Sequence, residues 1–342
     1  MRAFISGVAG PALTEAERRF LKEAQPWGLI AFKRNVAEPD ALRRLIDDFR
    51  TAVGRQAPVL VDQEGGRVQR LGPPHWPSYP PGAAYGVLYD RDRETGLAAA
   101  RLGARLIAAD LAQLGIDVDC APIADVPVAG ADPIIGDRAY GAAPDKVAAI
   151  AGAFAAGLAE GGVLPVLKHI PGHGRATADS HDRLPVVNAD RATLAASDFA
   201  AFRPLATLPL GMTAHVVFTV FDPVAPATTS ATIVRDVIRD SIGFAGLLMS
   251  DDISMGALSG SLRERTRAAI AAGCDMVLHC NGKMPEMLAV AAEAPLLAGE
   301  AARRAESALT ARKPAAPIDL PARRAEFFNL MAAVWQPARG WA

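Results

Sequence analysis

The sequence predicts an α/β fold, a single-domain (β/α)8 barrel of the TIM type, from three observations. Short β-branched or apolar runs alternate with amphipathic stretches of helical period along all 342 residues. This alternation is typical of repeated βα units around a parallel sheet. Eight such runs can be counted, which is the number of strands that closes a barrel of about 250 residues plus insertions. Finally, the polar motifs follow the ends of these runs, where barrel enzymes hold their active sites.

Each element can be placed by its residues. We expect strands at residues 3–7, 28–32, 58–62, 117–122, 163–168, 208–214, 246–250 and 275–279. We expect helices at residues 14–24, 40–53, 95–114, 145–160, 194–205, 232–241 and 262–272. The proline-rich residues 64–94 and residues 124–144 are expected to be long loops at the rim of the barrel. A doubly wound open sheet is the alternative, but it normally has fewer strands and a glycine-rich phosphate turn after the first one.

No linker divides the chain, so residues 1–342 are predicted to form one catalytic domain. Residues 286–342 should add a helix, a proline-containing turn and another helix that cap the barrel. With 51% hydrophobic residues and a net charge of −1, the chain has material for a large core and no excess of one charge. This balance gives no reason to expect nucleic acid or an anionic membrane as partner. We expect a soluble protein with a small-molecule substrate and no obligatory protein partner.

The cysteines indicate a reducing compartment. Cys120, Cys274 and Cys280 are odd in number and contain no Cys-x-x-Cys pair, so they predict neither a disulfide framework nor a structural zinc site. The apolar N-terminal residues are interrupted by Gly7 and Gly10, which favours a first strand over a signal peptide. We therefore expect a cytoplasmic location.

A dense histidine segment follows the fifth predicted strand. Lys168-His-Ile-Pro-Gly-His-Gly174 and Asp179-Ser-His181 place three of the six histidines within fourteen residues. Proline lacks an amide hydrogen and glycine permits backbone angles closed to other residues, so this segment is a loop rather than a helix. A loop that carries several imidazoles at a strand end indicates chemistry.

Asp179 and His181 are two residues apart, so in an extended loop their side chains lie on the same side. Asp179 can then hold one tautomer of His181, and such a histidine can give a proton to a leaving oxygen and later take one from water. The alternative is a loop histidine that its acidic neighbour fixes for structural reasons alone.

Two adjacent carboxylates, Asp251 and Asp252, end the seventh predicted strand. Neighbouring side chains of a strand point in opposite directions, so only one of them can face the mouth of the barrel. A carboxylate placed there can attack an anomeric carbon, as in retaining glycosidases. Either acid can instead cap the following helix, because Asp is a favoured N-cap residue. The residues alone do not choose between the two.

Five further polar residues follow strand ends and are candidates for holding the hydroxyl groups of a sugar. They are Asp62, Arg70, Arg138, Lys168 and His169. Buried charges of both signs must pair or meet a ligand, whereas a single charge at the rim is more often a surface ion pair. Their recurrence after successive strands favours a binding site.

Other chemistries have weaker support. His169 and His173 are four residues apart, but Pro171 and Gly172 prevent the helix that would make them a metal-ligand pair, and we expect no metal and no cofactor. Ser180 lies in no Gly-x-Ser-x-Gly elbow. Two alternatives remain, which are a barrel lyase or aldolase with Lys168 as Schiff-base former and a non-catalytic barrel that binds amino sugars.

Several motifs together resemble a known family. They are Lys168-His-Ile-Pro-Gly-His-Gly174, Asp179-Ser-His181-x-x-Leu-Pro, Gly243-Phe-Ala-Gly246, Ser250-Asp-Asp-Ile-Ser-Met255, Asp62-Gln-Glu-Gly-Gly-Arg67, Ile135-Gly-Asp-Arg138 and Met212-Thr-Ala-His215. In this order they resemble the β-N-acetylhexosaminidase branch of glycoside hydrolase family 3, from about residue 3 to about residue 285. One departure is Ile170, where the family usually has phenylalanine.

The resemblance implies a retaining hydrolase that releases N-acetylglucosamine from the non-reducing end of a β-linked substrate in cell-wall recycling. It implies that Asp251 is the nucleophile, His181 the general acid/base and Asp179 its partner. Asp62, Arg70, Arg138, Lys168 and His169 match the residues that hold the sugar. Many members have a second domain that supplies a carboxylic acid, for which this chain has no length left, and a histidine acid agrees with that expectation.

Overall fold

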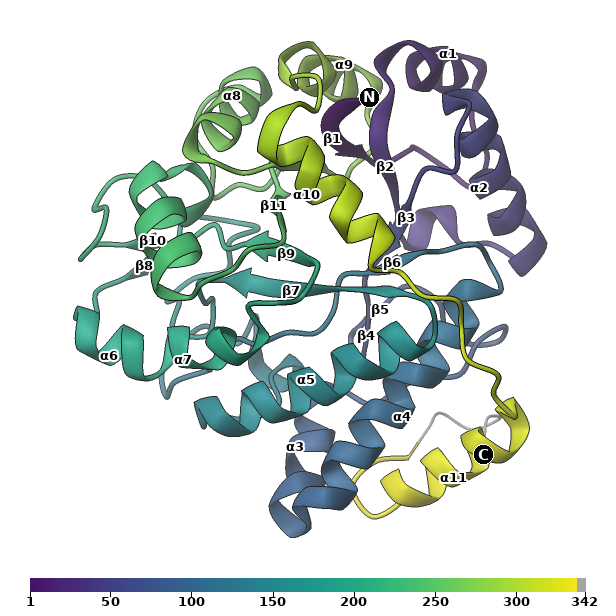
Figure 1. Cartoon of the computed structure of the whole chain (residues 1–342), viewed down its shortest axis with the longest axis vertical. Helices are drawn as coiled ribbons and strands as arrows, with labels where there is room; N and C mark the ends of the chain where they lie inside the picture. The colour runs from purple at the N-terminus through teal and green to yellow at the C-terminus, as the bar shows by residue number, and fades with distance from the viewer. Residues whose placement is uncertain (337–342) are drawn as a thin grey trace.

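The computed structural model describes residues 1–336 and contains a closed parallel barrel surrounded by helices (Figure 1). Around the barrel the strands follow the order β1-β12-β11-β9-β7-β6-β3-β2. Their bounds are β1 Arg2–Ser6, β2 Pro26–Ala31, β3 Val59–Val61, β6 Val118–Asp119, β7 Leu164–Ile170, β9 Leu210–Thr213, β11 Leu247–Asp252 and β12 Met276–His279. The predicted barrel is therefore confirmed, and each expected strand overlaps one of these eight.

The two faces of the strands bury different sets of side chains. Ile5, Leu60, Val166, Leu210 and Met276 belong to one buried cluster, which fills the barrel interior. Adjacent strand residues belong to a second, larger cluster between the strands and the outer helices, and they include Phe4, Val59, Val61, Leu167 and Val277. Strands buried on both faces appear in the sequence as continuous apolar runs, and such runs predict the positions of the strands.

The outer helices agree with the amphipathic stretches of the sequence, except that the helix expected at residues 194–205 is divided into short helices with a break at Ser197. Their bounds are α1 Glu15–Ala24, α2 Pro39–Val53, α4 Arg93–Ala112, α5 Pro144–Glu160, α6 Arg191–Ala196, α7 Asp198–Phe202, η5 Ile233–Ser241, α8 Leu262–Ala272 and α9 Met284–Glu293. Thr14 and Ser261 each begin a helix with a capping box, in which Glu17 and Glu264 return a hydrogen bond to the cap. Among residues 1–336, no helix has the length and apolarity needed to cross a membrane.

One expectation was wrong, because residues 64–94 are not simply a loop. They take part in a small hairpin of β4 (Gln63–Gly65) and β5 (Val68–Gln69), and they contain the helix α3 (Gly82–Arg91). A Cβ atom on Gly82 would lie 2.0 Å from the carbonyl oxygen of Arg138, so this glycine lets α3 approach the next rim segment closely. Tertiary packing rather than helical propensity stabilises this element. Short elements elsewhere are η1 Lys33–Asn35, η2 Gly136–Arg138, β8 Val186–Val187, η3 Arg203–Leu205, β10 Val217–Phe218 and η4 Ala227–Thr229.

The C-terminal segment closes the end of the barrel opposite the active-site rim. Ala305 and Ala308 of α10 (Gly299–Thr310) pack into the interior cluster. Arg304 donates to Asp275 at 2.9 Å, and Arg312 pairs with Asp117, so both arginines bind acids that precede barrel strands. Figure 1 shows α10 across the barrel and α11 (Leu320–Met331) beside α4.

Phe327→Ala should lower the free energy of unfolding by about 3–5 kcal/mol, because Phe327 is fully buried between α11 and α4 and its removal leaves a cavity. Urea unfolding measures the change. The neighbouring Phe328→Ala is the matched control, and its half-buried ring should contribute much less. Equal losses in the two variants would contradict the docking of α11.

Candidate active site

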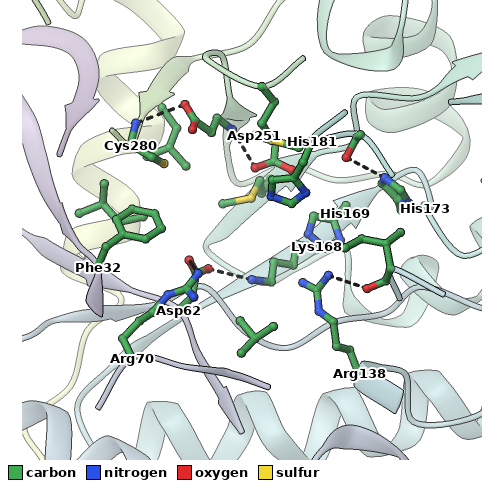
Figure 2. Close-up of a pocket in the computed structure, with 18 of the residues that line it drawn as sticks. Phe32, Asp62, Arg70, Arg138, Lys168, His169, His173, His181, Asp251 and Cys280 are labelled. Atoms are coloured by element: carbon green, nitrogen blue, oxygen red, sulfur yellow. Dashed lines mark hydrogen bonds and ion pairs between the residues drawn. The ribbon is translucent and has the colours of Figure 1, made fainter. Parts of the chain in front are cut away.

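A cavity of about 450 Å³ opens at the C-terminal ends of the barrel strands, a size that suits a small ligand. Its walls include all the candidate catalytic and sugar-binding residues except Asp179, which lies behind His181. Figure 2 shows Asp62, Arg70, Lys168 and Arg138 on one side of this cavity and Asp251 with His181 on the other. Residues from distant parts of the chain thus converge on one site.

Three cations and two carboxylates form a cluster along one side of the cavity, which we call the charged cluster (Asp62, Glu64, Arg70, Arg138 and Lys168). Lys168 Nζ donates to Asp62 Oδ1 at 3.0 Å and lies 2.6 Å from Glu64 Oε1. Arg70 donates to the other oxygen of Asp62 at 2.8 Å. Arg138 donates to both oxygens of Glu64, at 2.9 and 2.8 Å. The Lys168 side chain is only 2% exposed, so these contacts replace its water.

The charges in this cluster determine one another's protonation. Burial alone would raise the pKa of Glu64, but Arg138 and Lys168 lower it to about 2. Burial likewise opposes the charged form of Asp62, while Lys168 and Arg70 hold its pKa well below the ordinary value. Burial would lower the pKa of Lys168, but Asp62 and Glu64 raise it. Lys168 is therefore a fixed cation, which does not suit a Schiff-base nucleophile.

Glu64 was missed by the sequence reasoning, although it bridges Lys168 and Arg138. The spacing between Asp62 and Glu64 could have identified it. Glu64 is two residues after Asp62, and alternate residues of an extended segment lie on the same side. Asp125 was missed as well, and no pattern identifies it, because its partners are more than forty residues away in the chain.

Asp251 and Asp252 have different environments. The Asp252 carboxylate accepts hydrogen bonds from the amide and hydroxyl of Ser254 and from the amide of Cys280, at 3.0, 2.7 and 3.2 Å. Within residues 1–336, the carboxylate of Asp251 accepts only one, from the amide of Asp252 at 2.7 Å. The turn after β11 thus occupies Asp252 and leaves Asp251 available to a ligand.

The ionised form of Asp251 is favoured despite its burial. Burial alone would raise the pKa of this carboxyl, but the imidazoles of His215 and His169, the amide of Asp252 and the Lys168 cation lower it below the ordinary value. An ionised carboxylate is the form that can act as a nucleophile.

His181 and Asp179 form the pair that the sequence suggested. His181 Nδ1 lies 2.7 Å from Asp179 Oδ1, and the His181 amide donates to the same oxygen at 2.8 Å. These bonds assign Nδ1 to Asp179 and leave Nε2 of His181 for a ligand. The His181 side chain is 63% exposed, so it meets the cavity from the solvent side.

His169 is held in a similar way. Its Nδ1 lies 2.7 Å from Asp125 Oδ2, which leaves Nε2 for the cavity that His169 lines. His173 does not join it as a ligand pair, since the two rings meet edge to face with centroids 5.9 Å apart. Among residues 1–336, no group of three or more His, Cys, Asp or Glu side chains could hold a metal ion.

Known proteins are similar to this chain in sequence and in fold. Residues 5–306 match the family described as the glycosyl hydrolase family 3 N-terminal domain. A β-hexosaminidase of Alkalilimnicola ehrlichii is 40% identical over 281 residues, which cover 80% of this chain and 79% of the relative. The structure of NagZ from Neisseria gonorrhoeae in complex with N-trifluoroacetyl-D-glucosamine has a TM-score of 0.84 and 30% identity, and the match covers 97% of this chain and 96% of that one. A β-N-acetylhexosaminidase structure from Beutenbergia cavernae has a TM-score of 0.76 and 28% identity, over 90% and 96% of the two chains.

The fold, the cavity and these relatives together define a glycoside hydrolase of the β-hexosaminidase type. The chain belongs to glycoside hydrolase family 3, as its motifs implied. The lyase alternative has no support in either the relatives or the ion-paired state of Lys168.

Glu64→Gln should lower the free energy of unfolding by about 3–5 kcal/mol at neutral pH, because breaking a buried ion pair leaves its partners without compensation. The pKa of Glu64 falls from 4.5 to about 2 on folding, so its contribution is present above pH 4.5 and is lost as the pH falls toward 2. Urea unfolding between pH 7 and about pH 3 should therefore show a smaller acid-dependent loss in Glu64→Gln than in the wild type.

The control for this variant is Glu94→Gln, whose side chain is 80% exposed and should change stability by less than about 0.5 kcal/mol. If the wild type and Glu64→Gln gave parallel curves of stability against pH, the pairing described for the charged cluster would be wrong.

Proposed function

We propose that this protein is a retaining exo-β-N-acetylglucosaminidase, with Asp251 as nucleophile and His181, oriented by Asp179, as general acid/base. One observation carries the proposal, which is that Asp251 and His181 line the same cavity above the charged cluster. Asp251 comes from a barrel strand and His181 from a loop, and both lie on the side of the cavity that faces the charged cluster, so a sugar held in the cavity meets a carboxylate and an imidazole together (Figure 2).

The reaction proceeds in two displacements at the anomeric carbon. In the first, an oxygen of Asp251 attacks C1, the bond from C1 to the glycosidic oxygen breaks, and His181 Nε2 gives its proton to that oxygen. In the second, His181 Nε2 takes a proton from water while the water oxygen attacks C1 and releases the Asp251 carboxylate. Two inversions give net retention of configuration.

The charged cluster supports the binding of the non-reducing sugar. Asp62, Arg70, Arg138 and Lys168 present donors and acceptors that are fixed by their mutual ion pairs, and His169 adds its free ring nitrogen. Because these groups are already ordered, they lose little conformational entropy when hydroxyl groups replace water.

We infer that the sugar is N-acetylglucosamine. This inference is supported by the relatives named β-hexosaminidases and by the NagZ complex with an N-acylated glucosamine. The motifs imply N-acetylglucosaminyl-1,6-anhydro-N-acetylmuramic acid, with or without its peptide, as the substrate in cell-wall recycling. Three free, buried cysteines suit a reducing location such as the cytoplasm.

Asp251→Ala should reduce the rate of release of an aryl β-N-acetylglucosaminide on the order of 10⁴-fold or more, because no covalent intermediate can form. Asp252→Asn is the matched control, and it should keep most of the activity because the Asp252 carboxylate mainly binds the following turn. Comparable losses in both variants would refute the assignment of Asp251.

His181→Ala should lower kcat/KM roughly 10²–10⁴-fold for substrates with a poor leaving group and much less for activated aryl substrates, because protonation assists only a leaving group that needs it. Steady-state kinetics on a series of leaving groups tests this dependence. Equal losses across the series would contradict the role of His181 as the acid.

A further inference from the structure

The loop of residues 172–183, which we call the acid/base loop, carries Asp179, Ser180 and His181. These three residues alternate in direction. The His181 side chain is 63% exposed, whereas Ser180, between the two members of the dyad, is 3% exposed. The proposed reaction gives Ser180 no role, although it is the buried member of the motif.

Ser180 contacts a second buried polar group that the reaction does not use. Its Oγ lies 3.0 Å from Nε2 of His173, which is also 3% exposed. The amide of His173 donates to Asp125 Oδ1 at 2.6 Å, and Asp125 is fully buried and also holds His169. Burial keeps His173 neutral, with a pKa of about 4. A chain of contacts therefore links the hydroxyl of Ser180 to the barrel wall.

The backbone of the same loop rests on the segment that follows the candidate nucleophile. The amide of Gly256 donates to the carbonyl oxygen of His181 at 3.1 Å, and the amide of Ala257 donates to that of Ser180 at 3.1 Å. A Cβ atom on Gly256 would lie 2.7 Å from the His181 oxygen and 2.9 Å from the Asp182 oxygen. Only glycine lets the loop lie this close, because both obstacles are backbone atoms.

We propose that Ser180 and Gly256 are positioning residues that dock the acid/base loop, so that His181 is held at the same cavity as Asp251. Ser180 connects the dyad to His173 near the start of the loop, and Asp125, outside the loop, holds His173. Gly256 provides the surface on which the His181 backbone rests. The inference deepens the proposed function and rests on it. It links the two catalytic groups closely in the chain, since residues 255–257 lie in the turn that follows β11, the strand that carries Asp251.

This role has a kinetic consequence. A loop that leaves its docked position carries His181 away from the leaving oxygen, whereas Asp251 stays in place on its strand. Loss of docking should therefore impair the protonation of poor leaving groups and leave attack on activated aryl substrates nearly unchanged. A purely structural role for Ser180 would affect both kinds of substrate equally.

The test combines Ser180→Ala and Gly256→Ala with Ser230→Ala as the matched control. Ser230 is also buried, at 1% exposure. Its hydroxyl donates to the carboxylate of Asp222 and accepts from the amide of Ile233, away from the cavity. Two measurements are made on each full-length protein. One is kcat/KM for aryl β-N-acetylglucosaminides with leaving groups of graded acidity, and the other is hydrogen–deuterium exchange of the amides of Gly256 and Ala257.

For Ser180→Ala we expect faster exchange at these two amides and a kcat/KM about tenfold lower for the poorest leaving group, with less than about twofold change for the best one. Gly256→Ala should show the same pattern with a loss on the order of 100-fold, because its Cβ displaces the loop. Ser230→Ala should change neither the exchange nor the dependence on leaving group.

Unchanged exchange at Ala257 in both loop variants would overturn the docking role. Faster exchange without a steeper dependence of kcat/KM on the leaving group would instead refute His181 as the acid. The role of Ser180 and Gly256 in positioning that acid would then fall as well. The two failures are thus distinguishable, because the exchange measurement does not depend on any catalytic assignment.

Discussion

The burial of Lys168 at the end of β7 is the constraint on which the rest of the site depends. An ammonium group that is 2% exposed is stable only if carboxylates replace its water. Asp62 and Glu64 do so, and each of them requires a second cation, which Arg70 and Arg138 supply from separate rim segments. The requirement for charge balance thus draws the segments after β3 and β6 onto β7. The donors and acceptors that we propose for sugar binding are therefore ordered by their own ion pairs.

The two catalytic groups that we propose are held by different parts of the fold. Asp251 is part of a barrel strand that pairs with strands on both sides, so its position is determined by the most rigid part of the fold. His181 lies on a loop and is largely exposed. In the proposed reaction, this division puts the nucleophile on the rigid barrel and the acid/base near the solvent, from which water enters and into which the leaving group departs.

The sequence was sufficient for the barrel and for most of the site, for a physical reason. Strands buried on both faces give unbroken apolar runs, and the polar residues that follow them must gather at one rim, which located Asp62, Lys168 and Asp251 without any structure. The helix α3 was not predictable, since it depends on the close approach of Gly82 to Arg138 rather than on local periodicity.

The sequence also could not reveal hydrogen bonds between residues that are far apart in the chain. Side-chain chemistry left the choice between Asp251 and Asp252 open, and the motif resemblance indicated Asp251. The hydrogen bonds that Asp252 makes with Ser254 and Cys280 add a physical reason. Asp125 could not be recognised because its partners follow it by more than forty residues. Glu64, by contrast, could have been found from its spacing to Asp62. Motif resemblance supplied the proposed catalytic roles, which side-chain chemistry left open.

The most direct test is to trap the covalent intermediate. The protein is incubated with a fluorinated N-acetylglucosaminyl substrate that transfers its sugar faster than water removes it, and the labelled peptide is identified by mass spectrometry. The account predicts one sugar per chain, attached to Asp251. A sugar attached to any other residue, or turnover that inverts the anomeric configuration without a trapped intermediate, would contradict it.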